Sequence, residues 1–325
     1  MYKAFFNLQR NPFGITPDPS FLFPTKRHNE ALSALYYGVR RRKGFVVVTG
    51  EVGTGKTLLV RCLLQVLDGG DVAYAYVFNN RLSPVEFLQY VLSDLGFPTA
   101  GKNKGELLFE LGSLLTERHQ QNLTTVLVVD EAHHLSAELL EEIRLLTNLE
   151  TGQDKLLQIL LVGQPELDQQ LDSIHLRQLK QRIALRAHLH PLNEEETSGY
   201  IYRRLSLAGA NSHTRVIFPP YTIAKVFHYS KGIPRLINTV CENGLITAYA
   251  RQSQAVLPYM IDEVASDFRL DVELAAPIPQ GEISEVSAAA NTLLRFYEQF
   301  RAVRSDEMRS PAPIPAEAGK HEPHI

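Results

Sequence analysis

The chain has 325 residues, 44% of them hydrophobic and 21% charged, a balance typical of globular proteins with one large core or two smaller ones. Its formal net charge of −3 and its pI of about 6.4 provide no overall attraction to nucleic acid or to an anionic membrane. No stretch approaches the roughly 18 apolar residues of a membrane span, and no secretory signal pattern opens the chain. Cys62 and Cys241 fall in apolar helical patterns, which favours buried thiols. We therefore expect a cytoplasmic protein.

The first 26 residues are dense in phenylalanine and proline, which predicts an extended segment whose aromatic side chains bury against other parts of the chain. A helical pattern follows and ends in four consecutive cations, Arg40 to Lys43. Cations suit the negative end of a helix dipole, so a solvated helix end is favoured over a DNA contact.

A β-branched run at residues 45–49 leads into a glycine-rich turn and then into a helical pattern. This order predicts a phosphate-binding loop, in which glycines let the backbone approach a polyphosphate and a helix N-terminus faces the anion. We expect Lys56 to reach the β- and γ-phosphates of ATP and the Thr57 hydroxyl to bind Mg²⁺. The predicted nucleotide-binding residues are Gly50, Glu51, Val52, Gly53, Thr54, Gly55, Lys56, Thr57 and Leu58.

A second motif, the acidic pair Asp130-Glu131, follows the apolar run at residues 125–129. This run is predicted to be a central strand of a covered parallel sheet. Ligands bind at the carboxyl ends of such strands, so Asp130 and Glu131 are expected beside the phosphate loop. Asp130 would hold Mg²⁺ through water, and Glu131 would orient and deprotonate the attacking water.

A strand predicted at residues 156–162 ends near Gln164, which is placed to touch the γ-phosphate or the attacking water; simple turn chemistry is the alternative. Further strands are predicted at residues 72–78 and 185–189, with a short arginine-bearing helix at residues 175–183. Five strands alternating with helices predict an α/β fold with a five-stranded parallel sheet.

After residue 191 only helical patterns follow, which predicts a small all-helical lid. Beyond residue 274 the composition shifts to Ala, Pro, Glu and Ser, which indicates a linker, one helix at residues 288–304 and a disordered tail. The expected domains are an N-terminal segment at 1–26, the α/β domain at 27–191, the lid at 192–271 and the tail region at 272–325.

These motifs follow one another in the order seen in AAA+ ATPases, which the chain resembles over residues 1–270. Within that superfamily the chain is similar to the general secretion pathway protein A family, whose relatives include ATPases linked to exosortase and exopolysaccharide loci. Regulators of transposition are more distant kin. The resemblance rests on residues 11–13, 16–19, 49–57, 130–133, 161–167 and 232–238.

The resemblance implies a role for each matching position. Lys56 and Thr57 would be the Walker A pair, and Asp130 and Glu131 the Walker B pair. Gln164 would be sensor 1, and Arg235 sensor 2, reaching from the lid to the γ-phosphate. Arg182 best matches the arginine finger among the arginines of residues 177–186; it would act on the ATP of a neighbouring subunit.

If the resemblance holds, Phe13, Pro17 and His28 would be candidates for lining the adenine pocket, with core packing as the alternative.

The resemblance also implies a function: an Mg²⁺-dependent ATPase that forms a ring or filament and drives the assembly or remodelling of a secretion, pilus or polysaccharide-export system. It would act from the cytoplasmic side, in contact with the inner membrane through a partner. Full-length secretion proteins of this type continue into a membrane span and a peptidoglycan-binding domain, which we do not find in this sequence. The alternative is an ATP-dependent DNA-binding regulator of transposition or recombination, supported only by the cations at 40–43 and 177–186.

Overall fold

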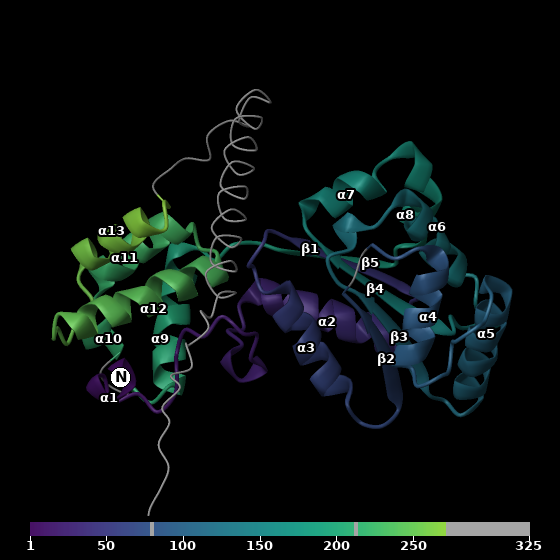
Figure 1. The fold of residues 1–325 in the computed structure, drawn as a ribbon, viewed down its shortest axis with the longest axis horizontal. Helices are drawn as coiled ribbons and strands as arrows, with labels where there is room; N and C mark the ends of the chain where they lie inside the picture. The colour runs from purple at the N-terminus through teal and green to yellow at the C-terminus, as the bar shows by residue number, and fades with distance from the viewer. Residues whose placement is uncertain (79–80, 211–213, 271–325) are drawn as a thin grey trace, which may run out of the picture. The chain divides into compact units, whose positions relative to one another are not determined.

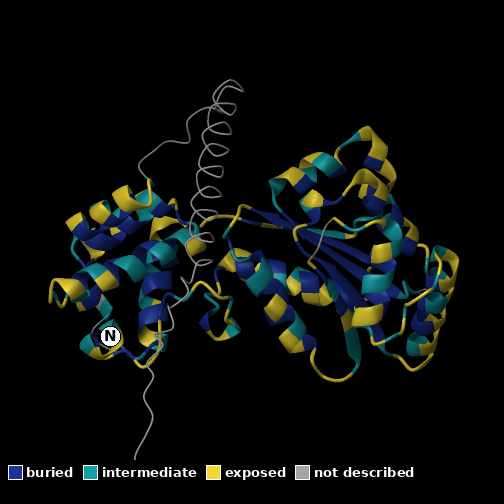
Figure 2. Cartoon of the chain, viewed as in Figure 1, coloured by how far each residue is buried: buried dark blue, intermediate teal, exposed yellow. Residues whose placement is uncertain are grey.

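The computed structural model describes residues 1–78, 81–210 and 214–270. Its centre is a five-stranded, all-parallel sheet with the strand order β2-β3-β4-β1-β5 (Figure 1). Every residue of β1, β3 and β4 is buried, as expected for inner strands covered on both faces (Figure 2). The strands are β1 Phe45–Gly50, β2 Val72–Val77, β3 Thr124–Val129, β4 Leu157–Gly163 and β5 Leu185–Leu189.

Two hydrophobic layers sandwich the sheet, because successive side chains of a strand point to opposite faces. On one face, α2 (Lys26–Arg40) and α3 (Lys56–Leu67) pack against Val46, Val128 and Val162. The other face packs Val47, Leu127 and Leu161 against the remaining helices of this domain. These are α4 Pro84–Asp94, α5 Lys104–Gln120, α6 Ala137–Leu146, α7 Pro165–Leu171 and α8 Arg177–Arg182, with 3₁₀ turns at Ala132–His134 and Ile174–Leu176.

A separate hydrophobic core lies among the helices that follow β5. The predicted lid is present and entirely helical within the described residues. Its helices are α9 Glu194–Leu207, α10 Thr214–Ile217, α11 Pro220–Ser230, α12 Pro234–Ala250 and α13 Pro258–Asp267. The parallel α/β sheet followed by a helical lid confirms the predicted fold class.

The N-terminal segment belongs to the lid core, where Phe6 and Phe13 are buried. It contains a short helix, α1 (Tyr2–Phe5), and a 3₁₀ turn at Pro19–Phe21, where a wholly extended segment was expected. The difference arises because the first proline is Pro12, which leaves residues 2–5 free to form helical hydrogen bonds.

No helix in the described part of the chain is long and apolar enough to cross a membrane. The predicted linker, helix and tail at residues 272–325 lie outside the described residues.

Candidate nucleotide site

The phosphate loop follows β1 and leads into α3. Gly53 and Gly55 have φ angles of +82° and +99°, a region that L-residues rarely adopt. Gly55 is the N-cap of α3, so the first backbone N–H groups of the helix open toward the loop. The Lys56 side chain is buried and its Nζ donates to the carbonyl oxygens of Gly50 at 2.7 Å and Glu51 at 3.0 Å. Burial lowers the pKa of Lys56, and the nearby carboxylates of Glu131 and Asp130 oppose that shift.

Asp130 lies directly after β3, and its carboxylate accepts three hydrogen bonds. The Thr57 hydroxyl donates to Oδ2 at 2.9 Å, and the Tyr76 hydroxyl donates to the same oxygen at 2.7 Å. Oδ1 accepts from the backbone N–H of Glu131 at 2.9 Å. Burial, followed by the charge of Asp130, raises the pKa of Tyr76, so the phenol remains a donor at neutral pH.

Glu131 follows at the sheet edge with a φ of +51°, a left-handed conformation for a residue other than glycine. Gln164, which follows β4, places its Nε2 at 3.5 Å from Glu131 Oε2, at the long limit of a hydrogen bond. His133 Nδ1 lies 3.5 Å from the same carboxylate oxygen and 3.4 Å from the backbone nitrogen of Gln164. Burial is the main cause that lowers the pKa of His133, so the ring is neutral at pH 7.

The lid meets the phosphate loop at the start of α12. The backbone N–H of Arg235 donates to the Gly53 carbonyl at 3.2 Å. A Cβ on Gly53 would come within 2.7 Å of Arg235 Cβ, so only glycine permits this approach. Gly232, just before α12, has a φ of +75°, and its Cβ would come within 1.8 Å of the Leu192 carbonyl. Both the phosphate loop and the connection from the sheet to the lid are therefore packed closely enough to require glycine.

A cavity of about 350 Å³ lies between the loop, the N-terminal segment and the lid. Its lining includes Lys56, Thr57, Glu131 and Arg235, so the structure brings these four predicted residues together. The N-terminal segment contributes Gly14 to Asp18, and the lid contributes Tyr200, Arg204 and Asn238.

Arg204 joins two walls of this cavity. Its guanidinium donates to the Pro12 carbonyl and, at 2.9 Å, to the Tyr200 hydroxyl. The Tyr200 hydroxyl in turn donates to Asn238 Oδ1 at 2.9 Å. These bonds fix the N-terminal segment on α9 and α12 of the lid.

The cavity and its lining fit a nucleotide with Mg²⁺. Mg²⁺ typically binds one or two protein oxygens together with substrate phosphates and water, and Thr57 and Asp130 supply such oxygens beside the loop. Among the described residues no group of three or more His, Cys, Asp or Glu side chains forms a metal cage elsewhere.

Three residues considered for an adenine pocket lie in different places. Pro17 lines the cavity, whereas Phe13 is buried in the lid core against Phe218. His28 is also buried, and its Nε2 lies 3.4 Å from the Thr54 carbonyl of the phosphate loop. His28 therefore contacts the phosphate loop and is not among the residues that line the cavity.

Arg182 lies away from the cavity of its own chain. Its guanidinium donates to Thr147 Oγ1 at 3.2 Å, at the end of α6. Arg177 begins the same helix and is exposed, whereas Arg186 pairs with Asp168 at 3.1 Å. A finger acting in trans need not line its own site, so this geometry leaves Arg182 and Arg177 as the two arginines to compare.

The cations at residues 40–43 are partly engaged within the chain. Arg40 pairs with Asp71, and Arg42 contacts His119 and Asp154. Of the four, Arg41 and Lys43 are exposed and the other two are half-buried. The segment is therefore mainly a helix end tied to neighbouring loops.

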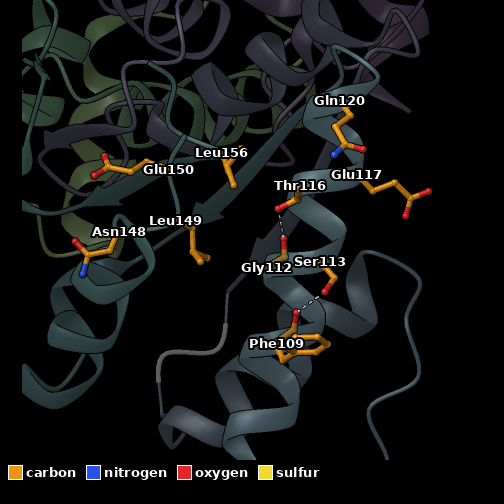
Figure 3. Close-up of a pocket in the computed structure, with 10 residues that line it drawn as sticks. All are labelled: Phe109, Gly112, Ser113, Thr116, Glu117, Gln120, Asn148, Leu149, Glu150 and Leu156. Carbon is orange, nitrogen blue, oxygen red and sulfur yellow. Dashed lines mark hydrogen bonds between the residues drawn. The ribbon is translucent and has the colours of Figure 1, made fainter. Parts of the chain in front are cut away.

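A second hollow of about 620 Å³ lies between α5 and the segment joining α6 to β4 (Figure 3). The Ser113 and Thr116 hydroxyls in it donate to carbonyls of their own helix, at Phe109 and Gly112. None of the predicted site residues lines it.

Sequence reasoning did not identify Tyr76, Tyr200, Arg204 or Asn238 as site residues. Tyr200 and Arg204 lie in α9, which carries no recognisable chemical motif, so only packing brings them to the cavity. Asn238 ends the 232–238 segment on which the family resemblance rests, but the sequence assigned it no role. One feature of the sequence could have pointed to Tyr76: it is a tyrosine near the carboxyl end of β2, the strand that pairs with β3, which Asp130 directly follows.

Comparison with known proteins places this geometry in a family. Residues 39–171 match the model of an AAA domain. The chain is 43% identical over 261 residues to general secretion pathway protein A of Aeromonas hydrophila, a match covering 79% of this chain and 46% of that protein. The chain therefore spans about half the length of this relative, and the family resemblance noted in the sequence is confirmed.

Solved structures agree with the fold. The ORC2 protein of Aeropyrum pernix, solved in ADPNP-ADP complexes, has a TM-score of 0.61 at 19% identity, covering 85% of this chain and 74% of that one. Cdc6p of Pyrobaculum aerophilum has a TM-score of 0.57 at 16% identity, covering 82% and 70%. At these identities the similarity shows a shared fold and nothing more specific.

Proposed function

Since the chain is an AAA+ protein related to general secretion pathway protein A, we propose that it binds and hydrolyses ATP with Mg²⁺ and couples hydrolysis to the assembly of an envelope secretion or export system. The observation that carries the catalytic part is the convergence of Lys56, Thr57, Glu131 and Arg235 on one cavity. Phosphoryl transfer requires mainly positioning and charge stabilisation, which these residue types supply.

In this proposal each residue has a distinct task. Lys56 and the N–H groups at the start of α3 bind the phosphates, while Thr57 and Asp130 hold Mg²⁺, whose charge would neutralise the phosphate oxygens. Glu131 takes a proton from the attacking water, and Gln164 orients the Glu131 carboxylate. Arg235 joins the γ-phosphate to α12, so that loss of this phosphate changes the contact between lid and loop.

We further propose that the chain assembles with copies of itself and completes each site with an arginine of α8 from a neighbour, Arg182 or Arg177. The assignment of Arg182 rests on its match to the family pattern. The exposure of Arg177 makes it the second candidate.

The secretion role rests on the similarity to general secretion pathway protein A and is proposed for the region that the two chains share. The protein would act at the cytoplasmic face of the inner membrane through a protein partner. A DNA-bound regulator has less support, because Arg40 and Arg42 are engaged in ion pairs within the chain.

Titration with a fluorescent ATP analogue, combined with a phosphate-release assay, tests the proposed site. Lys56→Ala should weaken nucleotide binding at least tenfold, because the buried ammonium is the main charge facing the phosphates. Glu131→Gln should bind as wild type but hydrolyse about 100-fold more slowly or worse, because it removes only the general base. Normal binding by Lys56→Ala, or normal turnover by Glu131→Gln, would show that the site assignment is wrong.

A further inference from the structure

Tyr76 lies on β2, beside the strand that leads to Asp130. In the parallel register, Tyr76 is paired with Val128 of β3. Val128 and Asp130 are two residues apart and therefore share a face of the sheet, as does the directly paired Tyr76. Two residues span about 6.6 Å along a strand. A tyrosine is long enough to cover that distance, and its hydroxyl reaches Asp130 Oδ2 at 2.7 Å.

The hydrogen bond from Tyr76 restricts the orientation of the Asp130 carboxylate. Asp130 is only 6% exposed, so its orientation depends on the three donors that surround it. Two of these, the Thr57 hydroxyl and the Glu131 N–H, belong to the motifs already assigned to the site. Tyr76 is the third donor and comes from a strand outside both motifs. Without its hydroxyl, Oδ2 keeps a single donor and the carboxylate gains freedom to rotate.

We propose that Tyr76 is a positioning residue for magnesium, one that fixes the Asp130 carboxylate in the orientation that a hydrated Mg²⁺ requires. Mg²⁺ demands near-ideal octahedral geometry, so a rotated carboxylate would bind its water ligands poorly. Groups that orient metal-binding carboxylates typically change metal affinity or activity by about 10- to 100-fold when removed. This inference rests on the proposed function, because it takes Asp130 to be the Mg²⁺ residue.

The test is the affinity of a fluorescent ADP analogue measured in EDTA and again with excess Mg²⁺. For Tyr76→Phe we expect wild-type affinity in EDTA and roughly tenfold weaker affinity with Mg²⁺. Tyr74→Phe is the matched control, since Tyr74 lies on the same strand and face but is not among the hydrogen-bond partners of Asp130. It should behave as wild type in both conditions. The inference would be overturned if Mg²⁺ increased the affinity of Tyr76→Phe for the ADP analogue as much as it increases that of Tyr74→Phe.

A double-mutant cycle separates this role from simple packing. If Tyr76 acts through Asp130, adding Tyr76→Phe to Asp130→Asn should change the Mg²⁺-dependent affinity no further. An additive loss in the double variant would contradict the inference and indicate a general structural role. If Asp130→Asn alone keeps the full effect of Mg²⁺, the proposed metal site is wrong and the inference fails with it. The single and double variants thus distinguish the two failures.

Discussion

At the scale of single residues, Arg235 combines a fixed backbone with an exposed side chain. Its N–H donates to the Gly53 carbonyl, and the residue is among those that line the cavity. Arg235→Ala should therefore weaken binding of a non-hydrolysable ATP analogue about tenfold, the usual loss for a charged hydrogen bond, and leave ADP affinity within about twofold. Calorimetric titration with both nucleotides measures this difference.

The matched control for Arg235 is Arg251→Ala. Arg251 lies just beyond the other end of α12 and pairs with Glu263. Arg251→Ala should change neither the affinity for the ATP analogue nor the affinity for ADP. Equal losses for ATP and ADP in Arg235→Ala would contradict a contact with the γ-phosphate.

At the scale of elements, the start of α2 supports the phosphate loop through His28. Thr25 Oγ1 accepts the His28 backbone N–H, so its own hydrogen is available to His28 Nδ1 at 2.7 Å. The Nε2–H of the neutral ring then points at the Thr54 carbonyl. Burial is the main cause that lowers the pKa of His28. A proton on Nδ1 would break the bond from Thr25.

The lowered pKa of His28 predicts a loss of stability in acid. Between its folded pKa and the unfolded value of about 6.5, the unfolded state binds more protons, so the free energy of unfolding falls as pH drops below about 6.5. Above that value His28 contributes no pH dependence. Melting temperatures from pH 7.5 downward should fall less steeply for His28→Gln than for wild type. The exposed His175→Gln serves as control, and identical slopes for His28→Gln and wild type would contradict the prediction.

The helices and strands differ in how well the sequence alone predicts them. All five strands and the phosphate loop were predicted, because buried parallel strands are continuous apolar runs and the glycine spacing of the loop is specific. Helix α6 was not predicted, although its Ser136 N-cap and the spacing of Leu139, Ile143 and Leu146 are typical of a helix. The contributions of Tyr76 and Arg204 depend on strand register and on lid packing, which a linear pattern does not encode.

At the scale of the whole molecule, the N-terminal segment connects the lid core to the α/β domain and lines the cavity on the way. Phe13 is fully buried in the lid core, with its ring 5.8 Å from that of Phe218. Phe13→Ala should lower the free energy of unfolding by about 3–5 kcal/mol. Urea unfolding measures this free energy. The control is Phe109→Ala, at a side chain that is 80% exposed, which should change the free energy of unfolding by less than about 0.5 kcal/mol. A loss below about 1 kcal/mol for Phe13→Ala would contradict this role.

The central claim is that this chain hydrolyses ATP in a site completed by a second copy. The most direct measurement is the rate of ATP hydrolysis per molecule against protein concentration, with Glu131→Gln as the background. A rate that rises with concentration is predicted for wild type. Arg182→Ala or Arg177→Ala should remove this rise, and mixing the inactive arginine variant with Glu131→Gln should restore turnover, because each supplies what the other lacks. A wild-type rate no higher than that of Glu131→Gln at every concentration would contradict the account.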